Sequence, residues 1–423
     1  MAATDIKYFT FENLNAPQLQ NAYGSMIEVL DACLVTGITL PQVAGITFAD
    51  GIATISFNTA HKLNQYQVIE ITGANVAELN TQHRLLSVTS TTATFKTSVT
   101  SVGGTFIARL PALGWEKAFG SSNVNGGGKA AYRSKNLLLP SRPFLRVVDE
   151  LDPAYTATYA KYAKVGIVED MTNIDTMLGV QAPFDSTLPD KNWAGTGSGT
   201  SAYNGWCKWF YARSVGAASQ AADSTATTSG VREWVLVGNS DWFYVLPATI
   251  SNDSNKLIYG FGSFESLMDT DASSNFLGGS FRYELVSSSS SSQPSFKGTT
   301  CGLGGNNYFA ATEQKIILQR EYTQNPKYSL ATCCSLLGNI ISGYEDRFGS
   351  ITLTNKAIFA PVFIKEEFVL RGKLPSLNWL YHKQPYSNMQ TFESNKRVLI
   401  SLKIVPYYNN VGSVLFDLGG MSV

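Results

Sequence analysis

Hydrophobic and polar residues alternate in short runs between positions 42 and 110, and these runs have no helical period. Turn residues separate the runs: Asp50-Gly51 divides the first two, and Gly103-Gly104 precedes the last. Short strands with a turn about every 8–12 residues are typical of a small barrel or sandwich. The pattern therefore predicts a small β-barrel at residues 42–110, inserted into a larger domain. The expected strands are 46–49, 52–57, 66–72, 84–89, 93–97 and 105–110.

The chain beyond residue 110 also has a β pattern. Its clearest hairpin joins residues 234–238 to 242–246, and both runs are apolar at odd and even positions alike. A strand with one face in water would alternate, so we expect both faces of this hairpin to be buried. A helical or extended conformation remains open for residues 329–337 and 339–344. Further strands are expected at 144–148, 259–267, 315–322, 351–353, 357–370 and 398–406, with a strand pair at 155–170.

One segment, residues 15–35, has apolar positions at helical spacing. Asn15 can cap a helix, Pro17 suits its first turn, and Gly37 can end it. The sequence thus predicts an N-terminal amphipathic helix packed on the main domain, with a docking arm for a partner as the alternative. The apolar positions are Leu19, Tyr23, Met26, Leu30 and Cys33.

These patterns together predict a mainly β protein. Residues 111–423 are expected to form an antiparallel, sandwich-like main domain, with the barrel at 42–110 inserted and the arm and helix at 1–41 packed on it. A length of 423 residues is compatible with such a division. Three loops rich in Gly, Ser, Thr and Ala interrupt the main domain, and we expect neighbouring chains to order them. They span residues 195–202, 214–230 and 287–307, the last with six consecutive serines at 287–292.

Charged residues are scarce. They make up 15% of the chain, against roughly 25% in ordinary soluble domains. Acidic and basic residues balance at 32 each, so the net charge is zero. This balance removes the long-range field that generic binding to nucleic acid or an anionic membrane requires. Proteins near neutrality also associate readily, and a surface with few charges can be covered by neighbouring subunits.

Cysteines and the N-terminal segment indicate synthesis in a reducing compartment. The five cysteines lack a C-x-x-C spacing, so we expect free buried thiols. Residues 1–11 lack a basic region followed by an apolar run, so no secretory signal is expected. No apolar stretch approaches the roughly 18 residues of a membrane span. The cysteines are Cys33, Cys207, Cys301, Cys333 and Cys334.

The sequence has few residues in patterns typical of metal binding or nucleophilic catalysis. The three histidines, His61, His83 and His382, form no metal-ligand spacing and no catalytic arrangement. Residues 269–275 resemble the start of a calcium loop, but Ser274 and Ser280 occupy positions that need Gly and Glu. We expect a loop capped by its own side chains, and a turn at the glycine-rich residues 302–305. No cofactor, metal or catalytic residue is assigned.

Paired carboxylates are the one catalytic option, because glycoside hydrolysis needs two carboxyl groups about 5–9 Å apart. The alternative is that they are surface or ion-paired groups. Five tryptophans could similarly form a sugar-stacking platform or pack in a core or interface. The carboxylate pairs are Glu150 with Asp152, Glu169 with Asp170, and Glu366 with Glu367. The tryptophans are Trp193, Trp206, Trp209, Trp234 and Trp242.

Several short segments resemble structural proteins of tailed bacteriophages. They are Ala-Cys-Leu-Val-Thr-Gly at 32–37, Gly-Trp-Glu-Lys-Ala-Phe at 114–119, Ala-Tyr-Arg-Ser at 131–134, Phe-Leu-Arg-Val at 144–147 and Arg-Gly-Lys-Leu-Pro at 371–375. The barrel, with His61 and residues 68–73 and 78–80, is similar to phage modules labelled after a β-domain of ubiquitin-activating enzymes. That label implies a fold only, since the chain has no adenylation motif.

The resemblance implies a virion component. Because the chain has few charges and no concentrated chemistry, we expect a non-enzymatic structural protein of the tail, baseplate or neck, made in the cytoplasm of a host bacterium. Its expected partners are further copies of the chain and other virion proteins. The alternative is a module that recognises a host-surface glycan through the tryptophan-flanked loops. A third hypothesis is a glycan-cleaving tail enzyme, which a tryptophan-lined groove with two close carboxyl groups would favour.

Overall fold

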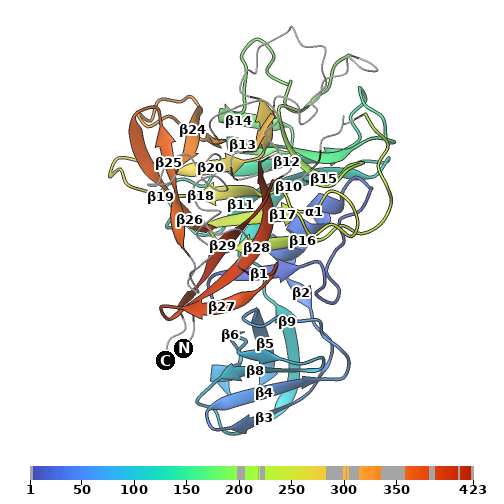
Figure 1. The fold of residues 1–423 in the computed structure, drawn as a ribbon, viewed down its shortest axis with the longest axis vertical. Coiled ribbons are helices and arrows are strands. Elements are labelled where there is room, and N and C mark those ends of the chain that lie inside the picture. The colour runs from blue at the N-terminus through green and yellow to red at the C-terminus, as the bar shows by residue number, and fades with distance from the viewer. Residues whose placement is uncertain are drawn as a thin grey trace.

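The structure is a computed structural model that describes residues 3–197, 205–217, 219, 224–282, 299–301, 303, 314–334, 358–380, 386–407 and 410–420. The regular structure of these residues is mainly β, and every pair of named strands is antiparallel. Figure 1 shows a large body above a small lobe. The prediction of a mainly β fold is confirmed. The serine run at 287–292, the expected strand at 351–353 and the segment 339–344 lie outside the described residues.

The small lobe consists of two four-stranded sheets. Its strands pair only with one another, in the orders β2-β9-β5-β6 and β3-β4-β8-β7. Their inward side chains, such as Ile55, Ile71 and Phe95, are fully buried. The strands are β2 (Ile38–Thr39), β3 (Val43–Ala49), β4 (Ile52–Phe57), β5 (Val68–Ala74), β6 (Gln82–Arg84), β7 (Ser87–Val88), β8 (Thr92–Lys96) and β9 (Gly104–Leu110), with a 3-10 turn at Ala77–Leu79.

Two sequence predictions in the lobe have different outcomes. The hairpin around Asp50-Gly51 is confirmed, because both residues have the positive φ, 50° and 73°, that a tight β-turn of this kind needs. The single strand expected at 84–89 is wrong. Its residues divide between β6 and β7, which belong to different sheets, and the buried Leu85 lies at the crossing.

The first sheet of the body has eight strands. They are β10 (Trp115–Ser122), β11 (Gly127–Ser134), β12 (Phe144–Glu150), β13 (Lys161–Asn173), β14 (Thr176–Ala182), β15 (Cys207–Ala212), β21 (Ser280–Arg282) and β22 (Thr299–Cys301). Their order is β10-β11-β12-β13-β15-β21-β22, and β14 pairs with β13. The strand pair expected at 155–170 is wrong, since one long strand, β13, begins only at Lys161.

The second sheet has thirteen strands. They are β1 (Lys7–Thr10), β16 (Trp234–Gly238), β17 (Trp242–Pro247), β18 (Tyr259–Ser263), β19 (Glu265–Ser266), β20 (Asn275–Gly278), β23 (Gln314–Leu318), β24 (Ser329–Cys334), β25 (Phe359–Glu366), β26 (Val369–Leu380), β27 (Thr391–Ser394), β28 (Arg397–Tyr407) and β29 (Asn410–Gly420). Their order is β1-β16-β17-β18-β20-β23-β24-β25-β26-β29-β28-β27, with β19 paired to β26. A helix at 329–334 is excluded, because β24 pairs with a strand on each side.

The β16–β17 hairpin lies in the middle of the body. One face packs on the eight-stranded sheet, where the rings of Trp115 and Phe243 meet edge to face at 5.3 Å. The other face packs on the far end of its own curled sheet, where Tyr244 and Phe416 lie 5.2 Å apart. Figure 1 shows β28 and β29 crossing in front of β16 and β17. The prediction that both faces of the hairpin are buried is confirmed, and one chain is sufficient to bury them.

The predicted amphipathic helix at 15–35 is wrong in its length and character. Residues before Gly24 are not helical, and Leu19 instead bridges Arg232 beside the main sheet. The α-helix α1 covers only Ser25–Leu30 and continues as a π-helical turn, Asp31–Thr36. Five of the six residues of α1 are buried, so it has no broad polar face. Its packing against β11 and β12 of the body outweighs the local spacing pattern.

Asp149 of β12 holds the start of α1. Its carboxylate is fully buried, accepts a hydrogen bond from the amide of Met26 at 3.1 Å, and accepts another from the Tyr211 hydroxyl at 2.6 Å. Burial raises the pKa of Asp149 from its ordinary value of 3.8 to about 6, although these hydrogen bonds oppose the rise. The carboxylate stabilises helix amides that would otherwise lack an acceptor.

Asp149→Asn should lower the free energy of unfolding by about 1–3 kcal/mol at pH 7, because an NH2 group replaces one of the two accepting oxygens and faces the donor that this oxygen accepted. The raised pKa means that the folded wild type binds the proton more tightly than the unfolded chain. Its stability contribution therefore grows as the pH falls through 6 toward 3.8. Urea unfolding at pH 7 and pH 5 should show the deficit of the variant widening at the lower pH. A deficit that narrows would contradict the assignment.

Candidate functional site

The first candidate pair, Glu150 and Asp152, lies beside a pocket that also contains Trp193. Asp152 is buried and forms an ion pair with Lys164, with 2.7 Å between Oδ2 and Nζ. The same oxygen accepts the Gly195 amide at 2.8 Å. Glu150 accepts a hydrogen bond from Asn123 at 3.1 Å. Asp152 thus serves as a fixed structural anion, whereas Glu150 is only partly buried.

The other two pairs are not brought together as pairs of acids. Glu169 accepts hydrogen bonds from Arg320 Nε at 2.9 Å and from the Val180 amide at 2.9 Å, while Asp170 accepts the adjacent Met171 amide. Neighbouring residues of a strand point to opposite faces, which separates their side chains. Glu366 is buried, and Glu367 occupies the exposed β25–β26 turn. Glu169 and Glu366 thus bind basic and backbone partners within the fold.

Arg371 joins two of the residues that the sequence singled out. It donates through Nε and Nη2 to both carboxylate oxygens of Asp271, at 2.9 and 3.0 Å, and through Nη1 to Glu366 at 2.7 Å. The side chains of Arg371 and Asp271 are 0% exposed. Asp271 in the loop resembling a calcium site thus binds a guanidinium. Among the residues that the structure describes, no cluster of three or more His, Cys, Asp or Glu could hold a metal ion.

Two histidines have structural roles in the lobe. His61 Nδ1 accepts the Leu63 amide at 2.9 Å, and its Nε2 lies 3.1 Å from the Thr92 carbonyl oxygen. His83 Nε2 lies 3.1 Å from the Leu79 carbonyl oxygen. Burial lowers the pKa of both imidazoles, so they are neutral at pH 7. His382 lies outside the described residues.

The candidate tryptophans are all buried, between 0% and 8% exposed. Trp209 stacks on Tyr259 with 5.8 Å between ring centroids, and its indole N–H donates to the Gly278 carbonyl. Trp234 donates likewise to the Pro17 carbonyl at 3.0 Å. Burial of all five rings favours packing over an exposed stacking platform, although Trp193 and Trp242 also line pockets. Of the cysteines, Cys33, Cys207 and Cys333 are buried, Cys334 is partly buried, and the Cys301 side chain is not described.

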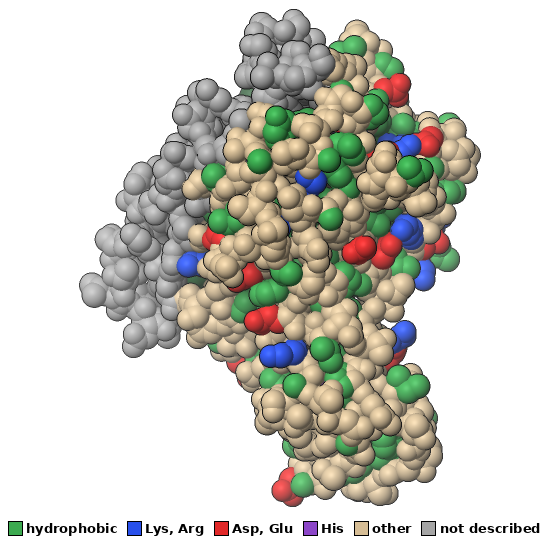
Figure 2. Space-filling view, turned by 90° about the vertical axis from the view of Figure 1, so that its right-hand side faces the viewer, with side chains coloured by type: hydrophobic (Ala, Val, Ile, Leu, Met, Phe, Trp, Pro, Cys, Tyr) green, Lys and Arg blue, Asp and Glu red, His purple; other side chains and the backbone are tan. Residues whose placement is uncertain are grey.

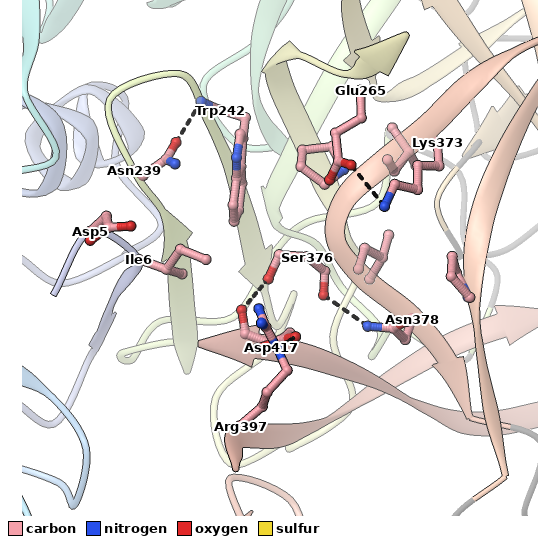
Figure 3. A pocket seen from close by; sticks show the side chains of 14 residues that line it. Asp5, Ile6, Asn239, Trp242, Glu265, Lys373, Ser376, Asn378, Arg397 and Asp417 are labelled. Carbon is pink, nitrogen blue, oxygen red and sulfur yellow. Dashed lines mark hydrogen bonds and ion pairs between the residues drawn. The ribbon is translucent and has the colours of Figure 1, made fainter. Parts of the chain in front are cut away.

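A pocket of about 440 Å³ opens between the β16–β17 turn, β26 and the last two strands. The Trp242 side chain extends from the turn toward Ser376 and Asp417 (Figure 3). Most polar groups of the wall already bind one another. Lys373 pairs with Glu265 at 2.7 Å, and Ser376 Oγ donates to the Asp417 carbonyl at 2.5 Å. The pocket therefore has a stable wall but offers few free groups to a ligand.

Beside this pocket, a buried polar joint connects the lobe to the body. Arg84 of β6 is 3% exposed and donates to four carbonyl oxygens at 2.6–2.9 Å. Asn13 and Gln67 exchange amide hydrogen bonds at 2.9 and 3.0 Å, and both are buried. The carbonyl groups that Arg84 contacts belong to Ala3, Ile6, Tyr66 and Leu418. Sequence analysis missed this joint, and the only signal was a charged residue inside an apolar β run.

Arg84→Ala should loosen the lobe without unfolding the body. Hydrogen bonds from a charged group each contribute about 1.5–3 kcal/mol, but water can reach part of the opened joint. We expect the free energy of local opening of the lobe to fall by about 2 kcal/mol, as measured by hydrogen exchange of its amides. Arg109→Ala is the matched control, since Arg109 is 49% exposed and pairs with Glu70 on the lobe surface. Equal exchange in the two variants would contradict a role of Arg84 in the joint.

No family model matches the chain, and the comparison with curated proteins gave no match. Within the described part of the chain, no helix has the length and apolar character needed to cross a membrane.

Proposed function

We propose that this protein is a non-enzymatic structural component of a tailed-phage virion, which assembles in multiple copies in the tail, baseplate or neck. The observation that carries the proposal is the polar joint of Arg84, Asn13 and Gln67. A lobe attached for independent movement needs only a flexible linker. A lobe fixed by a buried, fully hydrogen-bonded joint makes one stiff unit with the body, as a building block that repeats in an assembly requires.

The chemistry of the described side chains supports a structural role. The most reactive candidates, including Asp152, Asp271 and Glu366, form buried ion pairs that stabilise the fold. Charged side chains lie scattered or in small groups on the face in Figure 2. A surface with few charges lowers the cost of removing water between neighbouring subunits. Its neutral balance also disfavours nucleic acid and anionic membranes as partners.

One surface loop has the character of a contact between subunits. Leu137 and Leu138 are 78% and 92% exposed. Their loop is held in place, because Asn136 accepts the Leu138 amide at 3.0 Å and donates to Asp241 at 2.9 Å. A fixed loop that exposes adjacent leucines is an apolar knob, and burying both side chains against another copy would contribute about 3–5 kcal/mol. The proposed partners are such copies and other virion proteins, in a virion assembled in the cytoplasm of a host bacterium.

Sedimentation velocity and electron microscopy of the purified full chain test this proposal. We expect oligomers that grow with protein concentration, and mass spectrometry of the particles of the encoding phage should detect the chain. Leu138→Ser should weaken association at unchanged melting temperature, whereas Val124→Ser, at an equally exposed position in the β10–β11 turn, should not. A chain that stays monomeric at all concentrations and is absent from purified particles would overturn the proposal.

A further inference from the structure

A second pocket, of about 320 Å³, lies beside the eight-stranded sheet. Its wall combines residues of β11, β12, β13 and β14 with the segment 190–194. The size is at the lower end of the range for pockets that bind small molecules. The sequence pattern flagged Glu150, Asp152 and Trp193 separately but did not predict that they share a pocket, because Trp193 follows Asp152 by about 40 residues of loop and sheet.

The pocket is built on buried charges. Arg146, Asp152 and Lys164 are each 3% exposed. Arg146 donates through Nε to the Ile174 carbonyl at 2.8 Å and through Nη2 to Asp175 at 2.7 Å, and its guanidinium lies 4.5 Å over the Trp193 ring. Lys164 links Asp152 to the Trp193 carbonyl. These contacts hold the wall in one geometry before any ligand arrives, which lowers the entropic cost of binding.

Two hydrogen-bond donors of this wall have no acceptor within the described residues. They are Arg146 Nη1 and Trp193 Nε1, both buried. A buried donor without an acceptor costs about 1–3 kcal/mol of stability, so each such group needs an explanation. Both side chains line the same pocket, so a molecule bound there is the candidate outside the chain to supply the missing acceptors once these buried atoms become accessible to it.

The same pocket presents acceptors. Glu150, which also accepts a hydrogen bond from Asn123, and the exposed Asp190 both line it. In all, the lining carries four carboxylates, Glu150, Asp152, Asp175 and Asp190, and three cations, Lys129, Arg146 and Lys164. This excess of negative charge disfavours an anion. A small amine would donate hydrogen bonds to the carboxylates but would leave the donors of Arg146 and Trp193 without an acceptor.

Hydroxyl groups can bind both the donors and the acceptors of this pocket, because each hydroxyl can accept one hydrogen bond and donate another. We propose that this pocket binds a neutral sugar ring, whose hydroxyl groups accept from Arg146 and Trp193 and donate to Glu150 and Asp190. The binding site goes beyond the structural role proposed above and does not depend on it. Its location also differs from the loops around Trp206 and Trp209, since those two rings are buried in the core.

Ligand-observed NMR on the full chain tests the site, with methyl glucopyranoside, methyl galactopyranoside and methyl mannopyranoside as probes. Acetate and ethylammonium are the anionic and cationic alternatives. We expect at least one glycoside to bind with a millimolar dissociation constant. Trp193→Phe removes the indole donor, and Asp190→Asn replaces one oxygen of the exposed carboxylate with an amide donor and removes its charge, so each should weaken binding about tenfold. Trp242→Phe and Asp5→Asn, which change the other pocket in the same way, are the matched controls.

Asp190 is exposed, so Asp190→Asn should keep the wild-type melting temperature even if Trp193→Phe destabilises the fold. Glycoside binding that both variants leave unchanged would overturn the proposal. Binding of acetate or ethylammonium in place of the glycosides would also overturn it. Absence of binding by every probe at tens of millimolar would overturn it too, because water alone would then accept the hydrogen bonds of the two donors. Oligomer formation is unaffected by these outcomes, so failure here leaves the structural role intact.

Discussion

Arg371→Met should lower the free energy of unfolding by about 3–5 kcal/mol at pH 7, the usual cost of removing one partner from a buried ion pair. Arg371 is the only described cation that contacts Asp271 and Glu366, whose side chains are 0% and 3% exposed. Methionine fills much of the same volume but leaves the two carboxylates without a positive partner. Urea unfolding followed by tryptophan fluorescence measures the loss.

The pH dependence gives this prediction a second readout. Burial would raise the pKa of Asp271, but the hydrogen bonds and charge of Arg371 outweigh burial and lower it below its ordinary value of 3.8. Its contribution to wild-type stability is therefore complete at neutral pH and is lost only as the pH falls through that lowered pKa. In the variant, burial without the cation favours protonation, so its deficit should shrink between pH 7 and pH 4.

Lys373→Met is the control for Arg371→Met. Lys373 lies two residues further along β26 and pairs with Glu265, but the two side chains are 38% and 53% exposed. An exposed pair contributes only about 0–1 kcal/mol. If the two variants lose equal stability, the buried triad does not have the role assigned to it.

Much of the β architecture could be predicted because strand and turn signals are local. The tight turn at Asp50-Gly51 needs only its own two residues, and the unbroken apolar runs of β16 and β17 already indicate a hairpin covered on both faces. The order of strands is a different matter. β19 pairs with β26 about 100 residues away, and no local pattern encodes that choice. The same limit explains the wrong helix, since the contact between Leu19 and Arg232 decides the conformation of residue 19.

For the candidate sites too, the sequence indicated single residues but not their spatial arrangement. The sequence singled out Asp271 in a calcium-like loop and Glu366 in a carboxylate pair, and it named Arg371 only within a segment that resembles phage proteins. The convergence of the three residues depends on the curled thirteen-stranded sheet. Arg84 lies in no motif, and Arg146 lies only in the short segment 144–147 that resembles phage proteins. A charged residue in a strand is usually exposed, and only the tertiary structure makes these two central to the joint and to the smaller pocket.

Val237→Asp should abolish soluble, folded protein. Val237 is 0% exposed, and its strand neighbours are Tyr8 of β1 and Tyr244 of β17, which leave no cation within the described contacts to receive a carboxylate. An isolated charge in such a site costs several kcal/mol, and a small domain commonly has only about 5–15 kcal/mol of stability in total.

Val237→Thr has nearly the same shape and buries one hydroxyl, so it should fold with a lowered melting temperature. Val124→Asp places the same charge at a position that is 99% exposed and should behave as wild type. Soluble yield, far-ultraviolet circular dichroism and thermal melting of the three variants measure the effect, and a wild-type melting temperature for Val237→Asp would contradict the central position of the hairpin.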